Sequence, residues 1–217
     1  GKIGPIIYHV MFNITSSVSD LISCRDYILK GKKGKIVSPS QLDSTWLKQP
    51  KKLEIKFFKL LYVGRIKVEK GVYSLANLIK NRRDISLTTV GAEKNTSYKL
   101  NQSNIKILPN QNNKLKLIKC YDEHNIFILP SLTEGHPMVL LEALARRRPV
   151  VIFNEIKHVI GSKKGIFVSK RNFINFYETL SYIKKNYKKI QKDMQKNKLP
   201  TNKEFNEKFV KSIDDFK

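Results

Sequence analysis

The sequence has few acidic residues. It contains 18 Asp and Glu against 42 Lys and Arg, a formal net charge of +24 over 217 residues. A field of this sign attracts phosphate on nucleic acid, on anionic lipid or on a nucleotide. The lysines are spread along the chain, so a diffuse compositional bias and a dedicated polyanion surface both explain the excess. The sequence has no RNA-binding motif with interleaved aromatic residues and glycines, and nucleic acid is therefore not an expected partner.

Cysteine and long apolar runs are also scarce. Cys24 and Cys120 are far apart, which excludes a disulfide framework and makes a reducing cytoplasm the expected compartment. The four histidines form no ligand pair at helical spacing, and we expect no metal site. No apolar run approaches the ~18–20 residues that span a bilayer, and the start of the chain lacks the cleavage site of a signal peptide. The length suits one good core with a small appendage.

Short strands and helices alternate through the middle of the chain. The β-rich runs lie at 57–64, 85–91, 105–108, 125–131, 149–153 and 165–168. Amphipathic or apolar segments between them predict helices at 70–83, 113–121, 137–147 and 155–160. This alternation is typical of βα units and predicts an α/β fold with a doubly wound, Rossmann-like parallel sheet.

Three domain segments follow from this pattern. Residues 53–170 are predicted to form the Rossmann-like domain, and residues 171–217 to form C-terminal helices that pack on it, the first at 172–195. Residues 1–52 fit only the remnant of a preceding α/β domain and a linker, with a helix at 19–29, a strand at 34–39 and turn-rich chain at 38–52. The first residue is glycine rather than methionine, and we expect a fragment or a natural truncation.

Polar groups and glycines follow several predicted strands. In a parallel sheet ligands bind at the carboxyl ends of the strands, where helix amino ends present free amides. Arg65 and Lys70 follow the first strand, and Gly91 ends the second. Gly135 allows close approach to the backbone, and Pro137 suits a first helical position. Two cations and a helix dipole at one point predict a diphosphate site, although Arg65 and Lys70 also fit ordinary surface in so basic a chain.

A carboxylate lies within the apolar helix predicted at 137–147. Burying Glu142 without a partner would cost several kcal/mol or protonate it. The vicinal hydroxyls of a nucleotide ribose are one partner, and a structural bond to a nearby basic or backbone group is the other. Glu134 precedes the helix and also fits a capping acid that offsets the helix dipole. His136 beside it fits a loop or cap residue.

The complete string of motifs resembles a known family. "VGRIKVEKG" at 63–71, Gly91 and "FILPSLTEGHPMVLLEALARRRPVV" at 127–151 are similar to the C-terminal nucleotide-sugar-binding domain of glycosyltransferase family 4, which has the GT-B fold. The hallmark is a pair of glutamates separated by seven residues, Glu134 and Glu142, with a Pro-Val strand after them. That spacing alone is weak evidence, whereas the full string over about residues 57–170 is specific.

The resemblance implies a role for each motif residue. Arg65 and Lys70 would act in catalysis by holding the donor diphosphate and stabilising its charge as it leaves. Glu134 would contact the transferred sugar, and Glu142 would accept from the ribose hydroxyls. The other implied donor-binding positions are Gly64, Gly91, Leu108 and Pro109 near the base, and Gly135, His136, Pro137, Met138 and Val139 near the sugar and phosphates.

The resemblance also implies an activity and partners. We expect a hexosyltransferase that moves a sugar from a nucleotide sugar to a saccharide or glycolipid acceptor, with retention and without a metal cofactor, in polysaccharide or lipopolysaccharide assembly. The acceptor-binding domain of the family is largely missing, so this chain alone should bind donor without transferring it, unless a partner subunit supplies that domain. Peripheral contact with an anionic membrane fits the basic surface. A catalytically inactive nucleotide-sugar-binding module is the alternative function.

Two departures from the family pattern are visible. The family usually has a small residue shortly before the Pro-Val strand, where this chain has Arg146, Arg147 and Arg148. Where the family usually has a further glutamate after that strand, this chain has His158. Both departures fall outside the diphosphate loop at 63–71.

Overall fold

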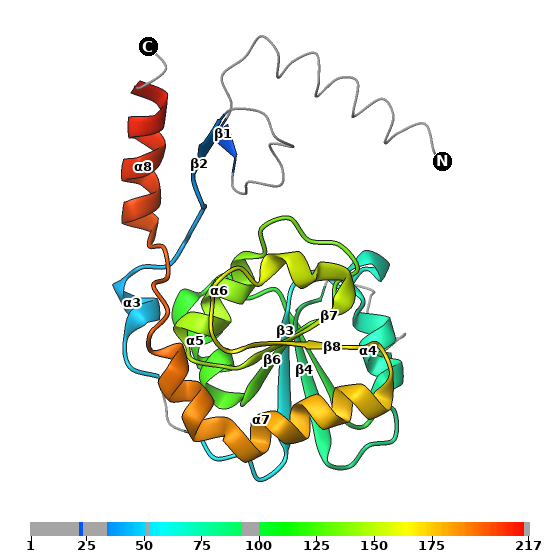
Figure 1. Cartoon of the computed structure of the whole chain (residues 1–217). Coiled ribbons are helices and arrows are strands. Elements are labelled where there is room, and N and C mark those ends of the chain that lie inside the picture. Colours follow the sequence, from blue (N-terminus) through cyan, green and yellow to red (C-terminus); the bar gives the residue numbers. More distant parts are fainter. Residues whose placement is uncertain (1–21, 24–33, 51–52, 93–99, 215–217) are drawn as a thin grey trace, which may run out of the picture. The chain divides into compact units, whose positions relative to one another are not determined.

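The computed structural model describes residues 22–23, 34–50, 53–92 and 100–214 (Figure 1). The chain divides into two compact units. One consists of residues 42–199, and the other combines residues 1–41 with residues 200–217.

The first unit is built on a six-stranded sheet in which every neighbouring pair is parallel. The strand order is β5-β4-β3-β6-β7-β8. The strands are β3 (Phe58–Val63), β4 (Ile85–Ala92), β5 (Ile105–Pro109), β6 (Ile126–Leu129), β7 (Val150–Phe153) and β8 (Ile166–Ser169). All six predicted strands are confirmed. β6 and β7 are buried along their whole length, which explains their uniformly apolar sequences.

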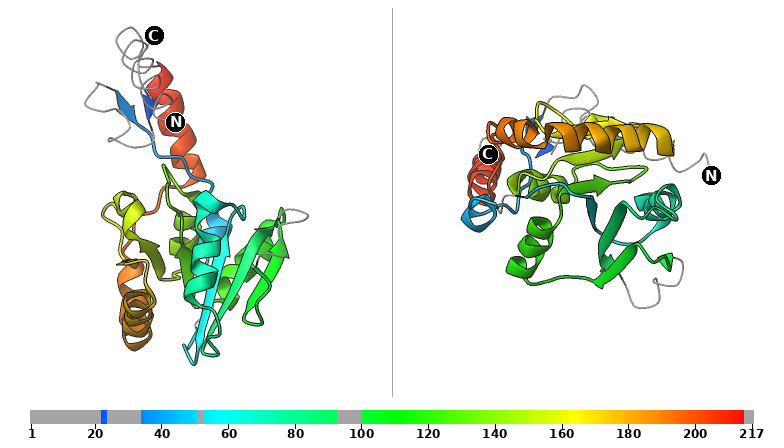
Figure 2. Two further views of the ribbon diagram at one scale, coloured as in Figure 1. Left: turned by 90° about the vertical axis from the view of Figure 1, so that its right-hand side faces the viewer. Right: turned by 90° about the horizontal axis from the view of Figure 1, so that it is seen from below.

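Helices cover both faces of this sheet, and the doubly wound Rossmann-like fold is therefore confirmed. Helices α5 and α6 lie on one face, and α4 and α7 on the other (Figures 1 and 2). The helices are α3 (Ser44–Leu47), α4 (Val72–Leu78), α5 (Lys114–Glu123), α6 (Met138–Ala145) and α7 (Phe173–Met194). Short 3-10 segments at Val68–Lys70 and Asn154–Val159 replace the start of the helix predicted at 70–83 and the helix predicted at 155–160.

The long helix α7 shows how a lysine-rich sequence joins this core. Its buried residues recur every three or four positions, which places them in one apolar stripe along the helix. They are Phe176, Leu180, Ile183, Tyr187, Ile190 and Met194. The lysines occupy the remaining positions, so the same helix packs on the sheet and presents positive charge to solvent.

The segment predicted as a turn-rich linker, at 38–52, includes the boundary between the two units, and part of it is folded. It contains α3, whose N-cap Asp43 accepts hydrogen bonds from the amides of Thr45 and Trp46. Trp46 is 2% exposed and packs edge-on against Tyr121, with ring centroids 5.6 Å apart. The turn-forming residues of this segment gave no indication of a buried side chain. Burial of the large aromatic ring of Trp46 anchors the segment to the core.

The second unit contains β1 (Ile22–Ser23), β2 (Lys35–Ile36) and α8 (Asn202–Asp214). β1 and β2 pair in parallel, which confirms the strand predicted at 34–39. The helix predicted at 19–29 is wrong at Ile22–Ser23, and its other residues lie outside the described part of the chain.

The C-terminal helices separate between the two units. Helix α7 packs on the large sheet, whereas α8 groups with residues 1–41. Ser40 donates its hydroxyl hydrogen to the carbonyl of Pro200 at 2.6 Å. This bond joins the end of the segment 1–41 to the beginning of the segment 200–217. None of the described helices is both long and apolar enough to cross a membrane.

Candidate active site

The sheet topology selects one place for a ligand. From β3 the chain proceeds outward through β4 and β5 on one side, and then through β6, β7 and β8 on the other. In such sheets the crevice lies beyond the carboxyl ends of the two strands where this direction reverses. The loops that leave β3 and β6 at this point carry Lys70 and Glu134, respectively.

These two loops are bonded directly to each other. The amide of Leu132 donates to the carbonyl of Glu69 at 2.9 Å. The Nζ of Lys70 lies 2.7 Å from Oε1 of Glu134, and the hydroxyl of Ser131 donates to the same oxygen at 2.7 Å. Lys70 therefore lies at the carboxyl edge beside the amino end of α6, where the sequence analysis placed it. Its charge is balanced by a carboxylate that an anionic ligand would have to replace.

Close backbone approach explains two glycines at this edge. Gly71 has φ 66°, and an added Cβ would lie 1.9 Å from the carbonyl oxygen of Pro130. Gly91 has φ 116°, and its added Cβ would lie 2.5 Å from the carbonyl oxygen of Gly64. Gly64 and Gly91 were predicted as site residues, whereas Gly71 was not. The Lys-Gly pair at the end of the motif at 63–71 could have indicated it. Only glycine fits Gly71 without moving the β6 loop.

The amino end of α6 is open. Gly135 is exposed, and an added Cβ would meet nothing within 4 Å. Pro137 is the N-cap with an extended ψ of 106°, so Met138 is the first helical residue, one position later than predicted. The first amides of a helix have no intrahelical acceptor, and those of Met138 and Val139 lie next to the exposed Gly135.

Arg65 lies in the same loop as Lys70, and its side chain is exposed. Its carbonyl accepts a hydrogen bond from the hydroxyl of Tyr62 at 2.7 Å. Burial raises the pKa of Tyr62, the negative charge of Glu134 raises it further, and the Arg65 cation opposes them. The charges of Arg65 and Glu134 therefore both act on the Tyr62 hydroxyl from the same edge of the sheet.

Glu142 is 1% exposed and has a phenol as a partner. The hydroxyl of Tyr121 in α5 donates to Oε2 of Glu142 at 2.7 Å. Burial, followed by the charge of Glu142, raises the pKa of Tyr121 well above its ordinary value. A ribose or a basic or backbone group was the predicted partner, and Tyr121 was not predicted, because nothing in the spacing of residues 121 and 142 indicates that α5 and α6 meet there.

Leu108 and Pro109 end β5, at the same edge of the sheet. They pair with Val90 and Ala92 of β4, with a shift in register between those two residues at Gly91. β5 is separated from β3 by β4, so these positions lie further along the edge than the Lys70–Glu134 pair.

Two further side chains contact the candidate site. Nε2 of His158 lies 2.7 Å from the carbonyl oxygen of Glu134. Arg171, which follows β8, donates to the carbonyl of Pro130 at 2.9 Å and to Oε1 of Glu155 at 2.8 Å. His158 is one of the departures from the family pattern, whereas no sequence motif predicted that Arg171 would lie at the site. In the described part of the chain, no three His, Cys, Asp or Glu side chains gather as a metal site.

Comparison with known proteins identifies the family. The sequence profile of the family described as "Glycosyl transferases group 1" matches residues 58–186. The chain belongs to this family. The resemblance that rested on the Arg65–Lys70 loop and the two glutamates is thereby confirmed for the family, while the roles of the individual residues stay predictions.

Similar proteins share the fold of this glycosyltransferase family. The capsular polysaccharide biosynthesis glycosyltransferase CapM of Staphylococcus aureus is 31% identical over 143 residues, which cover 56% of this chain and 37% of CapM. Sucrose-phosphate synthase from Thermosynechococcus elongatus superposes with a TM-score of 0.71 at 15% identity, covering 96% of this chain and 61% of the synthase. The lipopolysaccharide outer core galactosyltransferase WaaB gives 0.64 at 16% identity, covering 90% and 62%. The chain thus spans little more than a third of CapM.

Proposed function

We propose that the chain is the donor-binding half of a retaining hexosyltransferase that uses a nucleotide sugar. The observation that carries this proposal is the Lys70–Glu134 ion pair at the sheet's reversal point, beside the open amino end of α6. A cation, helix amides and a carboxylate at one place suit a diphosphate joined to a sugar. No metal is required, because Arg65, Lys70 and the amides of Met138 and Val139 would take the charge that a cation otherwise neutralises.

The proposed chemistry explains why Lys70 and Glu134 are paired. Transfer breaks the bond between the anomeric carbon and a diphosphate oxygen, which leaves the sugar oxocarbenium-like and the diphosphate more negative. A preorganised donor aimed at that charge is worth roughly 3–4 kcal/mol of barrier. When the diphosphate binds Lys70, it displaces the carboxylate of Glu134, which then contacts the transferred sugar. The ion pair thus holds both groups in place before the donor arrives.

The rest of the donor would extend along the carboxyl edge. In the proposed complex Glu142, which accepts a hydrogen bond from Tyr121, would also accept from the ribose hydroxyls. Leu108 and Pro109 would lie beside the base, and Gly64 and Gly91 would let the donor approach the strand ends closely. His136 would lie at the sugar and phosphates, next to Gly135.

The acceptor is proposed to be a saccharide or a lipid-linked glycan of cell-surface polysaccharide assembly. The names of CapM and WaaB, which concern capsular polysaccharide and lipopolysaccharide, support this class. We place the protein in the cytoplasm, with peripheral contact to the anionic inner face of the membrane through its basic surface. Pelleting with phosphatidylglycerol vesicles should decline as salt rises, and salt-insensitive binding would contradict the electrostatic contact.

Donor binding is tested by thermal shift with UDP, GDP, ADP and their glucose conjugates. One nucleotide series should raise the Tm saturably, because a ligand that binds only the folded state stabilises it. Lys70→Met should weaken that ligand at least about tenfold, the usual size of a lost charge-assisted bond. Lys67→Met is the matched control, since it removes the same charge from the same loop. The proposal fails if no nucleotide shifts the Tm, or if both variants behave alike.

Transfer needs more than this chain. In the proposed enzyme the acceptor-binding domain belongs to a longer protein or to a partner subunit, so the 217-residue chain should bind donor without turnover. Release of nucleoside diphosphate in the presence of acceptor, measured with the chain alone, would contradict this part of the proposal.

A further inference from the structure

Three consecutive arginines precede β7, and two of them have clear structural roles. Arg146 is 3% exposed and forms a two-pronged pair with Asp122, with Nε–Oδ1 at 3.0 Å and Nη2–Oδ2 at 2.7 Å. Arg148 is 1% exposed and donates from Nε to the carbonyl of Tyr121 at 2.8 Å. Arg147 is half-buried, and no hydrogen bond or ion pair joins its guanidinium to a described residue. Its guanidinium is therefore available for an interaction outside the described residues.

The backbone of Arg147 is strained. It has φ 50°, in the left-handed region, and follows the C-cap of α6, where glycine is the favoured residue. Among the described residues other than glycine, only Asn81 shares a positive φ, and asparagine tolerates that region well. A bulky residue kept in a costly conformation points to a use for its side chain.

Arg147 lines a hollow of about 640 Å³ at the amino edge of the sheet, opposite the candidate active site. Lys188 and Lys192 of α7 also line it, so three cations face one carboxylate, Glu54. The two lysines are four residues apart on one helix, where like charges repel. The carboxyl end of α6, where the helix dipole is negative, would otherwise repel an anion. It does not do so here, because the amides of 146–148 donate to the carbonyls of 142–144.

The other groups that line the hollow can contact neutral polar and apolar parts of a ligand. Gln49, Gln191 and Gln195 contribute side-chain amides, each able to donate and to accept. Nε2 of Gln191 donates to the carbonyl of Arg147 at 3.2 Å, which holds the strained backbone in place. Pro50 and Leu53 supply an apolar patch. Cations, amides and an apolar patch together match a ring that bears hydroxyls, a C–H face and a carboxylate.

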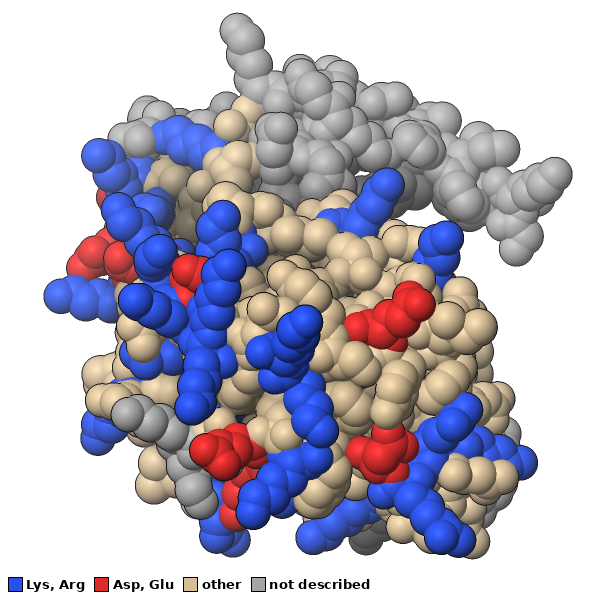
Figure 3. All heavy atoms as spheres, turned by 60° about the horizontal axis from the view of Figure 1, so that its bottom comes forward, with Lys and Arg blue, Asp and Glu red and all other residues tan. Residues whose placement is uncertain are grey.

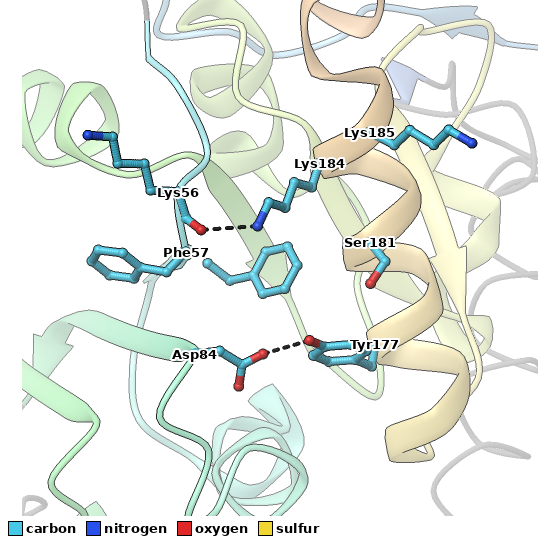
Figure 4. A pocket seen from close by; sticks show the side chains of 8 residues that line it. Lys56, Phe57, Asp84, Tyr177, Ser181, Lys184 and Lys185 are labelled. Carbon is cyan, nitrogen blue, oxygen red and sulfur yellow. Dashed lines mark hydrogen bonds between the residues drawn. The ribbon is translucent and has the colours of Figure 1, made fainter.

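A second hollow beside α7 shows the contrast (Figure 4). It measures about 380 Å³ and also contains lysines, and two hydrogen bonds join groups that line it. Lys184 donates to the carbonyl of Lys56 at 3.0 Å, and the hydroxyl of Tyr177 donates to Asp84 at 2.7 Å. Figure 3 shows lysine and arginine side chains scattered over one face of the molecule. The hollow at Arg147 differs from the second hollow because it combines cations with side-chain amides.

We propose that the hollow lined by Arg147, Lys188 and Lys192 binds an anionic saccharide, with Arg147 pairing with its carboxylate. The location, at the amino edge, separates this site from the donor site. The source of the saccharide rests on the proposed function, because an enzyme of surface-glycan assembly meets charged chains as acceptor or product. The hollow would then hold a growing chain on the protein between transfers.

The proposal is tested by calorimetric titration of the full 217-residue chain with a tetramer of galacturonic acid. Binding should be saturable, and Arg147→Gln, which keeps the strained backbone, should weaken it about tenfold, which corresponds to about 1.4 kcal/mol. Arg147→Gly should lose as much affinity while its Tm stays constant or rises by up to about 3 °C, because glycine relieves the strain. Lys185→Gln is the control, since it removes one charge from α7 outside this hollow.

Three results would overturn the proposal. They are no saturable binding of the tetramer, whether or not the chain shows Arg147-dependent binding to phosphatidylglycerol vesicles, equal binding of neutral maltotetraose, and unchanged affinity of Arg147→Gly. Lys70→Met should leave the tetramer's affinity unchanged, and Arg147→Gly should leave nucleotide binding unchanged. If no nucleotide binds but the tetramer does, only the proposed function fails.

Discussion

The two edges of the large sheet carry positive charge in different ways. At the carboxyl edge Lys70 is 2.7 Å from the carboxylate of Glu134, and the loops around them are joined by backbone hydrogen bonds. At the amino edge Lys188 and Lys192 extend from α7 toward solvent, and the structure shows no ion pair for either among the described residues. In a chain of net charge +24, positive charge alone therefore does not locate the site. What distinguishes the candidate active site is a lysine held in place by a compensating carboxylate.

The edges also differ in what gives them shape. Backbone determines the carboxyl edge, where Gly71 and Gly91 allow backbone contacts that no side chain would permit. Side chains determine the amino edge, where Arg147 is retained at a position that favours glycine. Substitutions should therefore have opposite effects at the two edges, and three further experiments sharpen or break this comparison.

The largest effect is expected at Gly71. Gly71→Ala should lower the free energy of unfolding by about 2–4 kcal/mol, because the new Cβ meets the Pro130 carbonyl at a positive φ. Gly135→Ala is the matched control at the same edge and should change it by less than about 0.5 kcal/mol, since the added Cβ contacts nothing. Urea unfolding measures both, and equal stability of the two variants would refute the close approach.

An intermediate effect is expected at the buried phenol. Tyr121→Phe removes a hydrogen bond to the enclosed carboxylate of Glu142 and should cost about 1.5–3 kcal/mol of unfolding free energy. Tyr177→Phe removes a 2.7 Å bond to Asp84 in the second hollow beside α7, where water can replace it, and should cost less than about 1 kcal/mol. Thermal unfolding compares the two. A larger loss for Tyr177→Phe would reverse the expected ranking.

The smallest effect concerns pH. Burial lowers the pKa of His124, against the bond between its ring and the Cys120 carbonyl, which raises it. The unfolded chain therefore binds the proton more readily than the folded protein. Stability should fall as pH drops below the ordinary value of 6.5, until the folded group also titrates. His124→Gln should flatten the dependence of unfolding free energy on pH between 5 and 7, and an unchanged slope would contradict the burial effect. Above pH 8 the two curves should run parallel.

Much of this protein was predictable from local sequence. The six strands follow from short apolar runs, because strands covered by helices on both faces need apolar residues throughout. The motif loops fell at the carboxyl edge for a related reason, since every parallel strand ends there. Local sequence did not predict how single side chains and segments pack. Trp46 anchors a turn-rich segment to the core, and α8 groups with the second unit.

The sequence by itself determined the family, the Rossmann-like order of elements and the meeting of Lys70 with the loop of Glu134, because strand order and motif spacing are local properties. Only the tertiary structure decided that Tyr121 bonds Glu142, that Gly71 abuts Pro130, and that Arg147 faces a hollow while Arg146 and Arg148 are buried. Those pairings join residues distant in sequence, and how closely two helices or loops pack depends on the whole core around them.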